Sequence, residues 1–167
     1  MGKRELWFCG SVNETSAKAL LDGLIGLWRK KKARITLYIT SPGGYIPVAL
    51  AVYEFIRTKS IVLQTIAMGQ VASSALLIFL AGKRRIATAN TTFFVHEITR
   101  SWDSPPHLAS RELTRLAEAT VAEQKLMCRL LAEETGLSEE QWQTLAEQQT
   151  YITAQQALEY GLVHKVI

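Results

Sequence analysis

Hydrophobic and polar positions in the first hundred residues follow two periods in turn. Five short apolar runs have the length and the β-branched or aromatic content of strands: 6–9, 35–40, 61–68, 85–87 and 92–96. Apolar residues between these runs recur at helical spacing, which predicts three helices: about 13–31, 47–58 and one that begins near 73. Strands that alternate with helices predict an α/β fold with parallel strands.

The second part of the chain contains a much longer helical pattern. A proline-containing loop at 101–106 precedes a helix of about 28 residues, about 42 Å long, that stops before Gly136. A helix of this length in a small domain is expected to project, and its apolar face then needs a partner. Capping boxes at 138–141 and 153–156 predict two more helices, and 162–167 is a last strand. With no linker or repeat, we expect one domain, 1–167.

The composition supports a packed domain and excludes two classes of partner. Hydrophobic residues make up 48% of the 167 positions, enough for a substantial core. The net charge is only +4, and the basic clusters at 29–32 and 83–85 are interpreted as a helix end and a solvated turn. The longest apolar stretch, 75–81, is far shorter than the ~20 residues of a membrane span. We expect no nucleic acid and no membrane as partner.

The cysteines and the first residues favour a cytoplasmic location. Cys9 and Cys128 are isolated in the sequence, without the spacing of a disulfide framework. The basic start is not followed by a long apolar run, so no signal peptide is predicted.

Ser73 is the first candidate for chemistry. It follows a predicted strand and a Gly69-Gln70 turn, and it opens an apolar helix. The free N–H groups and positive potential of a helix N-terminus suit a nucleophile that generates an oxyanion. An N-cap serine would explain the same position, and Ser74 competes for either role.

Two further segments end at predicted strands. Gly43 and Gly44 allow a backbone to approach a ligand closely, although ordinary turn chemistry also explains them. His96 ends a strand and is a candidate general base, because histidine titrates close to neutral pH; a partly buried polar residue is the ordinary alternative. The histidines and cysteines show no metal-ligand spacing, and no phosphate-binding loop is present. We expect no metal and no cofactor.

Four segments together resemble the Clp protease proteolytic subunit (ClpP) family over about 4–167. They are Ser-Pro-Gly-Gly at 41–44, Met-Gly-Gln-Val-Ala-Ser at 68–73, Phe-Val-His at 94–96 and Ala-Leu-Glu-Tyr-Gly-Leu-Val at 157–163. The resemblance implies a ClpP/crotonase-type fold: a head of parallel strands and helices (about 1–99 and 150–167) and a projecting helical handle (about 100–149).

The resemblance also implies roles for individual residues. Ser73 matches the nucleophile, His96 the base, and the N–H groups of Gly44 and Ser74 the oxyanion hole. The position of the triad aspartate falls on Gln149, which can orient an imidazole but cannot stabilise its cation by charge. The segment that follows His96 also departs from the family's Gln-Pro and glycine-rich strand.

The resemblance therefore predicts a serine-type endopeptidase for short or unfolded polypeptides, assembled as heptameric, stacked homo-oligomeric rings, with an AAA+ ATPase unfoldase as partner. The glutamine at 149 keeps a second hypothesis open, a weakly active or inactive structural or regulatory ring subunit. A crotonase-type acyl-CoA enzyme is a third hypothesis, and it requires a catalytic carboxylate at the site.

Overall fold

The computed structural model describes residues 4–30, 34–100 and 107–167. The elements follow one another as β1 (Glu5–Cys9), α1 (Glu14–Trp28), β2 (Ile35–Ser41), α2 (Ile46–Thr58), β3 (Leu63–Ala72), α3 (Ala75–Leu80), β4 (Arg84–Ala87), β5 (Thr92–Val95), α4 (Ser110–Glu134), α5 (Glu139–Glu147), β6 (Thr150–Thr153), α6 (Ala154–Glu159) and β7 (Lys165–Val166). This alternation confirms the predicted α/β class.

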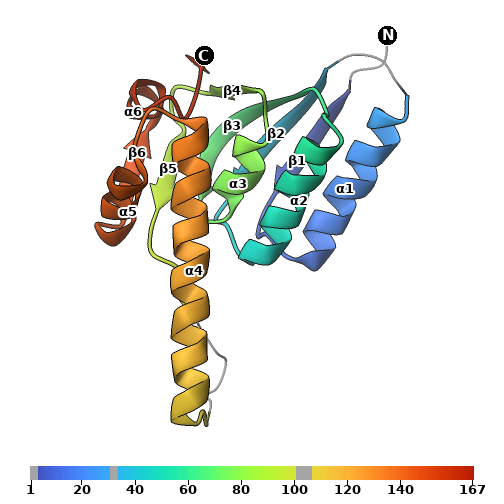
Figure 1. The fold of residues 1–167 in the computed structure, drawn as a ribbon. Helices are drawn as coiled ribbons and strands as arrows, with labels where there is room; N and C mark the ends of the chain where they lie inside the picture. The colour runs from blue at the N-terminus through green and yellow to red at the C-terminus, as the bar shows by residue number, and fades with distance from the viewer. Residues whose placement is uncertain (1–3, 31–33, 101–106) are drawn as a thin grey trace.

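The strands form one sheet whose main path is parallel. Its order is β1-β2-β3-β4-β7, while β5 pairs with the last part of β3, and β6 pairs antiparallel with β5. Helices α1, α2 and α3 lie side by side on one face of the sheet (Figure 1). The chain therefore crosses from strand to helix at the carboxyl ends of β2 and β3, where sites of α/β folds are commonly built.

Helix α4 has two unlike halves. Its C-terminal half packs on the head through Met127, Cys128, Leu130 and Leu131. Its N-terminal half is largely exposed and extends well beyond the other elements (Figure 1). The predicted projection of this helix is confirmed, although the helix begins at Ser110 rather than directly after the loop predicted at 101–106.

A buried arginine fastens the end of α4 to the sheet. Arg85, 3% exposed, donates to the carbonyl oxygens of Glu134, Gly161 and Leu162, and its guanidinium lies 3.4 Å from the Glu134 carboxylate. Arg57 contacts the same carboxylate at 2.9 Å. Burial lowers the pKa of Arg85, and Glu134 opposes that effect.

Several predicted boundaries were wrong. The strand expected to stop at Met68 runs to Ala72, because Gly69, with φ 71°, lies where the β2–β3 register shifts instead of ending the strand. Strand β6 was not predicted at all. The first helix stops at Trp28, and the last strand is limited to Lys165–Val166. The loop predicted at 101–106 and the positions 31–32 lie outside the described residues.

Within the described residues, no helix combines the length and apolarity that crossing a bilayer requires.

Candidate active site

Ser73 is held at a strained turn between β3 and α3. Its φ is 53°, a left-handed conformation that is uncommon for a residue with a side chain. Its N–H donates to the carbonyl of Phe94 at 2.9 Å, which continues the β3–β5 pairing by one residue. A sharp strand-to-helix turn of this kind presents a serine hydroxyl at the end of a sheet. The N-cap interpretation of Ser73 is wrong, because Ser74 is the N-cap of α3.

Ser74 is completely buried, and its backbone N–H rather than its hydroxyl is the group of interest. Its hydroxyl caps nothing and has no hydrogen-bond partner among the described residues. Its N–H likewise donates to no described group. An unpaired N–H beside the serine of the turn is a donor available to an oxyanion.

Two glycines bring a second backbone segment against this turn. A β-carbon on Gly43 would lie 2.7 Å from Ser73 Cβ and 3.2 Å from Ser74 N, so only glycine permits the approach. Gly44 forms a bridge with Val12, in which the Gly43 carbonyl and the Tyr45 N–H make the hydrogen bonds. The Gly44 N–H is left without a partner among the described residues.

His96 directly follows β5, and two contacts orient its ring. Nδ1 lies 2.5 Å from the carbonyl oxygen of Glu97. A carbonyl oxygen only accepts, so the neutral form of this ring has its proton on Nδ1 and its lone pair on Nε2. The ring also stacks on Phe94, which stacks on Tyr151 of β6. This is the tautomer that a general base needs.

The structure brings three of the predicted site residues into one pocket of about 460 Å³. Ser73, His96 and Gly44 line it, together with residues that sequence reasoning missed: Pro42, Tyr45, Ile46, Ile98, Thr99 and Arg100. The available signal was their position directly after the glycine turn and after His96. No hydrogen bond joins the Ser73 hydroxyl to His96 in the described part of the chain. Catalytic hydrogen bonds are often long without substrate, so the shared pocket is the informative observation.

Gln149 lies opposite His96 in the extended β5–β6 register, but no hydrogen bond joins the two among the described residues. The β5–β6 pairs end with Val95 opposite Thr150, and the next position in that register would set His96 opposite Gln149. Gln149 has φ 50° and an exposed side chain, which forms no hydrogen bond with any described residue. The Glu97 carbonyl, not Gln149, therefore contacts Nδ1.

Carboxylates are absent from the described lining of this pocket. The crotonase-type hypothesis therefore lacks the catalytic carboxylate that it requires. No group of three or more His, Cys, Asp or Glu side chains suited to a metal ion occurs within 4–30, 34–100 and 107–167.

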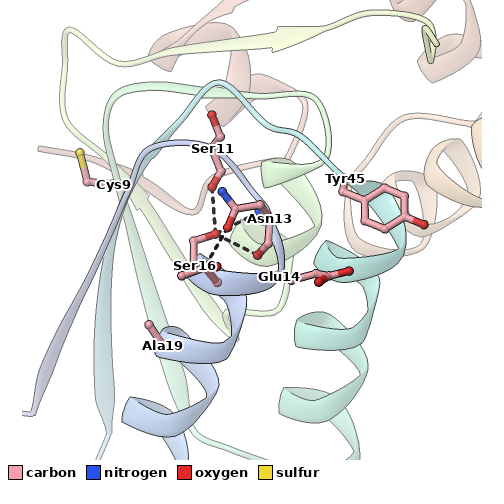
Figure 2. A pocket seen from close by; sticks show the side chains of 8 residues that line it. Cys9, Ser11, Asn13, Glu14, Ser16, Ala19 and Tyr45 are labelled. Carbon is pink, nitrogen blue, oxygen red and sulfur yellow. Dashed lines mark hydrogen bonds between the residues drawn. The ribbon is translucent and has the colours of Figure 1, made fainter. Parts of the chain in front are cut away.

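A second hollow, which shares Tyr45 with the Ser73 pocket, lies at the beginning of α1 (Figure 2). Its polar groups bond mainly to each other: Asn13 and Ser16 form a capping box, and the Ser16 hydroxyl donates to the Ser11 carbonyl at 2.9 Å. The polar side chains here are thus explained by the start of the helix.

Comparison with known proteins decides the family. The Clp protease family model matches residues 1–167, the whole chain. The chain belongs to the Clp protease family.

Individual Clp relatives agree in sequence and in structure. The ATP-dependent Clp protease proteolytic subunit of Ligilactobacillus salivarius is 30% identical over 98% of this chain and 83% of its own length. The proteolytic subunit 1 of Corynebacterium glutamicum is 31% identical over 98% and 79%. The solved structure of a ClpP1 point mutant from Listeria monocytogenes superposes with a TM-score of 0.86, at 25% identity, over 98% of this chain and 91% of that one. The predicted resemblance and the ClpP-type fold are confirmed.

Proposed function

We propose that this Clp protease family member is a serine-type endopeptidase that cleaves short or unfolded polypeptides. The observation that carries the proposal is the convergence in one pocket of a strained serine, a histidine with a free Nε2 and the glycine turn beside Ser73. Its relatives are named proteolytic subunits of Clp proteases, which supports the same reaction class.

The chemistry proceeds in two stages. The Ser73 hydroxyl attacks the peptide carbonyl while Nε2 of His96 accepts its proton, and the N–H groups of Gly44 and Ser74 stabilise the oxyanion. His96 then gives that proton to the leaving amine as the C–N bond breaks, which leaves an acyl-enzyme on Ser73. Water activated by His96 hydrolyses the ester and restores the serine.

The lack of a negative charge at Gln149 is expected to weaken His96 as a general base without abolishing that role. The Glu97 carbonyl holds the Nδ1 proton, so the reactive tautomer does not depend on a carboxylate. Neither a carbonyl nor a carboxamide carries the negative charge that stabilises an imidazolium. We therefore expect slow turnover.

Exposed apolar side chains support the proposed assembly and partner. Leu113 and Val121, 52% and 53% exposed, lie on the projecting half of α4 and suit the contact between stacked homo-oligomeric, heptameric rings. Trp7, 66% exposed and stacked on Tyr38, suits the docking of an AAA+ ATPase unfoldase. The relatives' name, ATP-dependent Clp protease proteolytic subunit, supports this partner class. A cytoplasmic location stays a prediction.

Hydrolysis of a fluorogenic peptide library tests the proposal. Purified protein should release fluorophore slowly, and the Ser73→Ala variant should release none above background. Equal rates from the two proteins would show that another group or a contaminant is responsible, and would overturn the proposal.

A second candidate function is a structural or regulatory ring subunit with little activity of its own. The specific observation in its favour is that Gln149 makes no hydrogen bond to His96. Intact oligomers that hydrolyse no peptide, and that gain activity only with a second type of Clp subunit, would support this function over the first.

A further inference from the structure

Arg100 is the one permanently charged side chain among the described residues that line the Ser73 pocket. Its side chain is 27% exposed, so most of it is removed from water. Three of the other lining side chains, Pro42, Ile46 and Ile98, are apolar, and the rest of the lining is mixed. A fixed cation beside an apolar wall affects which side chains a pocket accepts.

The guanidinium is fixed by two bonds to α4. Nε donates to Thr120 Oγ1 at 3.0 Å, and Nη2 donates to a Glu123 carboxylate oxygen at 2.8 Å. The Thr120 hydroxyl in turn donates to the Leu116 carbonyl at 2.8 Å, which sets its own direction. A guanidinium has five N–H donors, so three remain without a partner among the described residues.

The geometry of attack on Ser73 decides which substrate side chain lies close to the Arg100 guanidinium. For attack, the scissile carbonyl carbon must approach the Ser73 hydroxyl to within about 3–3.5 Å. The Cα of the residue that owns this carbonyl is bonded to the attacked carbon, so its side chain begins close to Ser73, in a pocket whose lining also includes Arg100. An apolar side chain there would cover guanidinium N–H groups without supplying an acceptor, which is unfavourable.

We propose that Arg100 makes the peptidase selective for polypeptides with glutamate at the residue whose carbonyl is attacked. This inference rests on the proposed peptidase function. The methylenes of glutamate pack on the apolar wall, and its carboxylate accepts from the free guanidinium N–H groups. Glu123 already balances part of the cation's charge, so it limits the preference.

The test compares three substrates, Ac-Ala-Ala-X-aminomethylcoumarin with X as Glu, Gln or Leu. A charge-assisted hydrogen bond predicts a kcat/KM for Glu about 10-fold or more above that for Leu, with Gln between them. Arg100→Met should reverse the Glu/Leu ratio. Glu123→Gln removes the competing carboxylate and should raise that ratio further.

These two variants distinguish selectivity from a purely structural role. If the Arg100–Glu123 pair only supported the fold, both variants would lower all three rates together and leave the ratio unchanged. Ratios that move in the same direction in both variants, or a wild type that does not favour Glu, would overturn the inference.

A readout without catalysis separates this inference from the proposed function. Binding of the amides Ac-Ala-Ala-X-NH₂ to Ser73→Ala protein should show the same order, Glu above Gln above Leu. Absent turnover with that order retained would count against the peptidase function alone. Binding without the order would overturn the selectivity of Arg100.

Discussion

At the scale of single residues, the backbone builds the candidate site as much as the side chains do. Ser73 has a left-handed φ, the Ser74 and Gly44 N–H groups have no partner in the described chain, and the Glu97 carbonyl fixes the tautomer of His96. These features need no carboxylate. The feature that a carboxylate would add is charge stabilisation of the imidazolium.

Replacing Gln149 by Asp should therefore increase activity. In serine proteases the loss of the triad Asp charge lowers kcat about 10⁴-fold, so we expect Gln149→Asp to raise kcat, by as much as about 100-fold. Steady-state kinetics on one fluorogenic peptide measures the change. Gln149→Asn is the control without charge and should leave kcat near the wild-type value. An unchanged kcat in the Asp variant would mean that a charge at position 149 does not act on His96.

The approach of Gly43 to Ser73 gives a second prediction. Gly43→Ala places a methyl group 2.7 Å from both Ser73 Cβ and the Ala72 carbonyl oxygen, so the turn must shift and kcat/KM should fall by about 100-fold or more. Gly10→Ala is the matched control, because Gly10 also has a positive φ but no atom within 4 Å of the added carbon. Similar losses in both variants would show that backbone strain, not the contact with Ser73, matters.

The candidate residues were predictable from the sequence, but their contacts were not. Ser73, His96 and the glycines stood where predicted strands end, so parallel topology brought them together. The orienting role of Glu97 was not predictable, because it is made by a carbonyl and every residue has one. Arg100 follows His96 by four positions, and nothing in the local sequence indicates that α4 fixes its guanidinium.

At the scale of elements, the end of α4 depends on ionic contacts rather than on apolar packing alone. Arg85 of β4 bonds three carbonyl groups that would otherwise lie unpaired at the ends of helices and turns. The backbone N–H of Arg85 donates to Nδ1 of His164 at 3.0 Å. The pKa of His164 is lowered, mainly because the ring is partly buried and secondly because the Arg85 cation lies nearby. This direction favours the neutral ring, which an accepting Nδ1 requires.

Removing Arg85 should destabilise the head. Arg85→Met leaves buried carbonyls and the Glu134 carboxylate without their main donor, although Arg57 still pairs with Glu134. We expect a loss of about 2–3 kcal/mol in the free energy of unfolding, measured by urea denaturation at fixed protein concentration. The exposed neighbour gives the control: Arg84→Met should change stability by less than about 0.5 kcal/mol. Equal effects would contradict the role of this network.

The elements with strong local signals were the ones that sequence reasoning identified. The capping boxes at Ser138 and Thr153 do begin α5 and α6. Strand β6 was missed because its four residues are only half-buried and acquire their pairing from β5, which is distant in sequence. The end of β3 was missed because Gly69 was interpreted as a turn.

At the scale of the whole molecule, the projecting half of α4 is the main unexplained surface. Leu113, Ala117 and Val121 are exposed, are spaced by four residues and form one stripe along the projecting half of α4 (Figure 1). An apolar stripe on an isolated projection is unfavourable unless a second copy covers it.

A charge on that stripe should therefore disturb assembly. Val121→Glu is expected to reduce the largest oligomer by half, from stacked rings to single rings, by burying an unpaired carboxylate at the contact. Analytical ultracentrifugation measures the change in mass. Ala119→Glu adds the same charge on the opposite side of the helix and should leave the mass unchanged. Identical masses for both variants and the wild type would place the ring contact elsewhere.

The most direct test of the central claim is labelling with a fluorophosphonate probe. Such a probe reacts only with an activated serine and needs no knowledge of substrate preference. We expect mass spectrometry to find one modified residue, Ser73, with labelling lost in Ser73→Ala and much slower in His96→Ala. Absence of labelling on Ser73 in an intact wild-type oligomer would contradict a working serine nucleophile and favour the structural subunit.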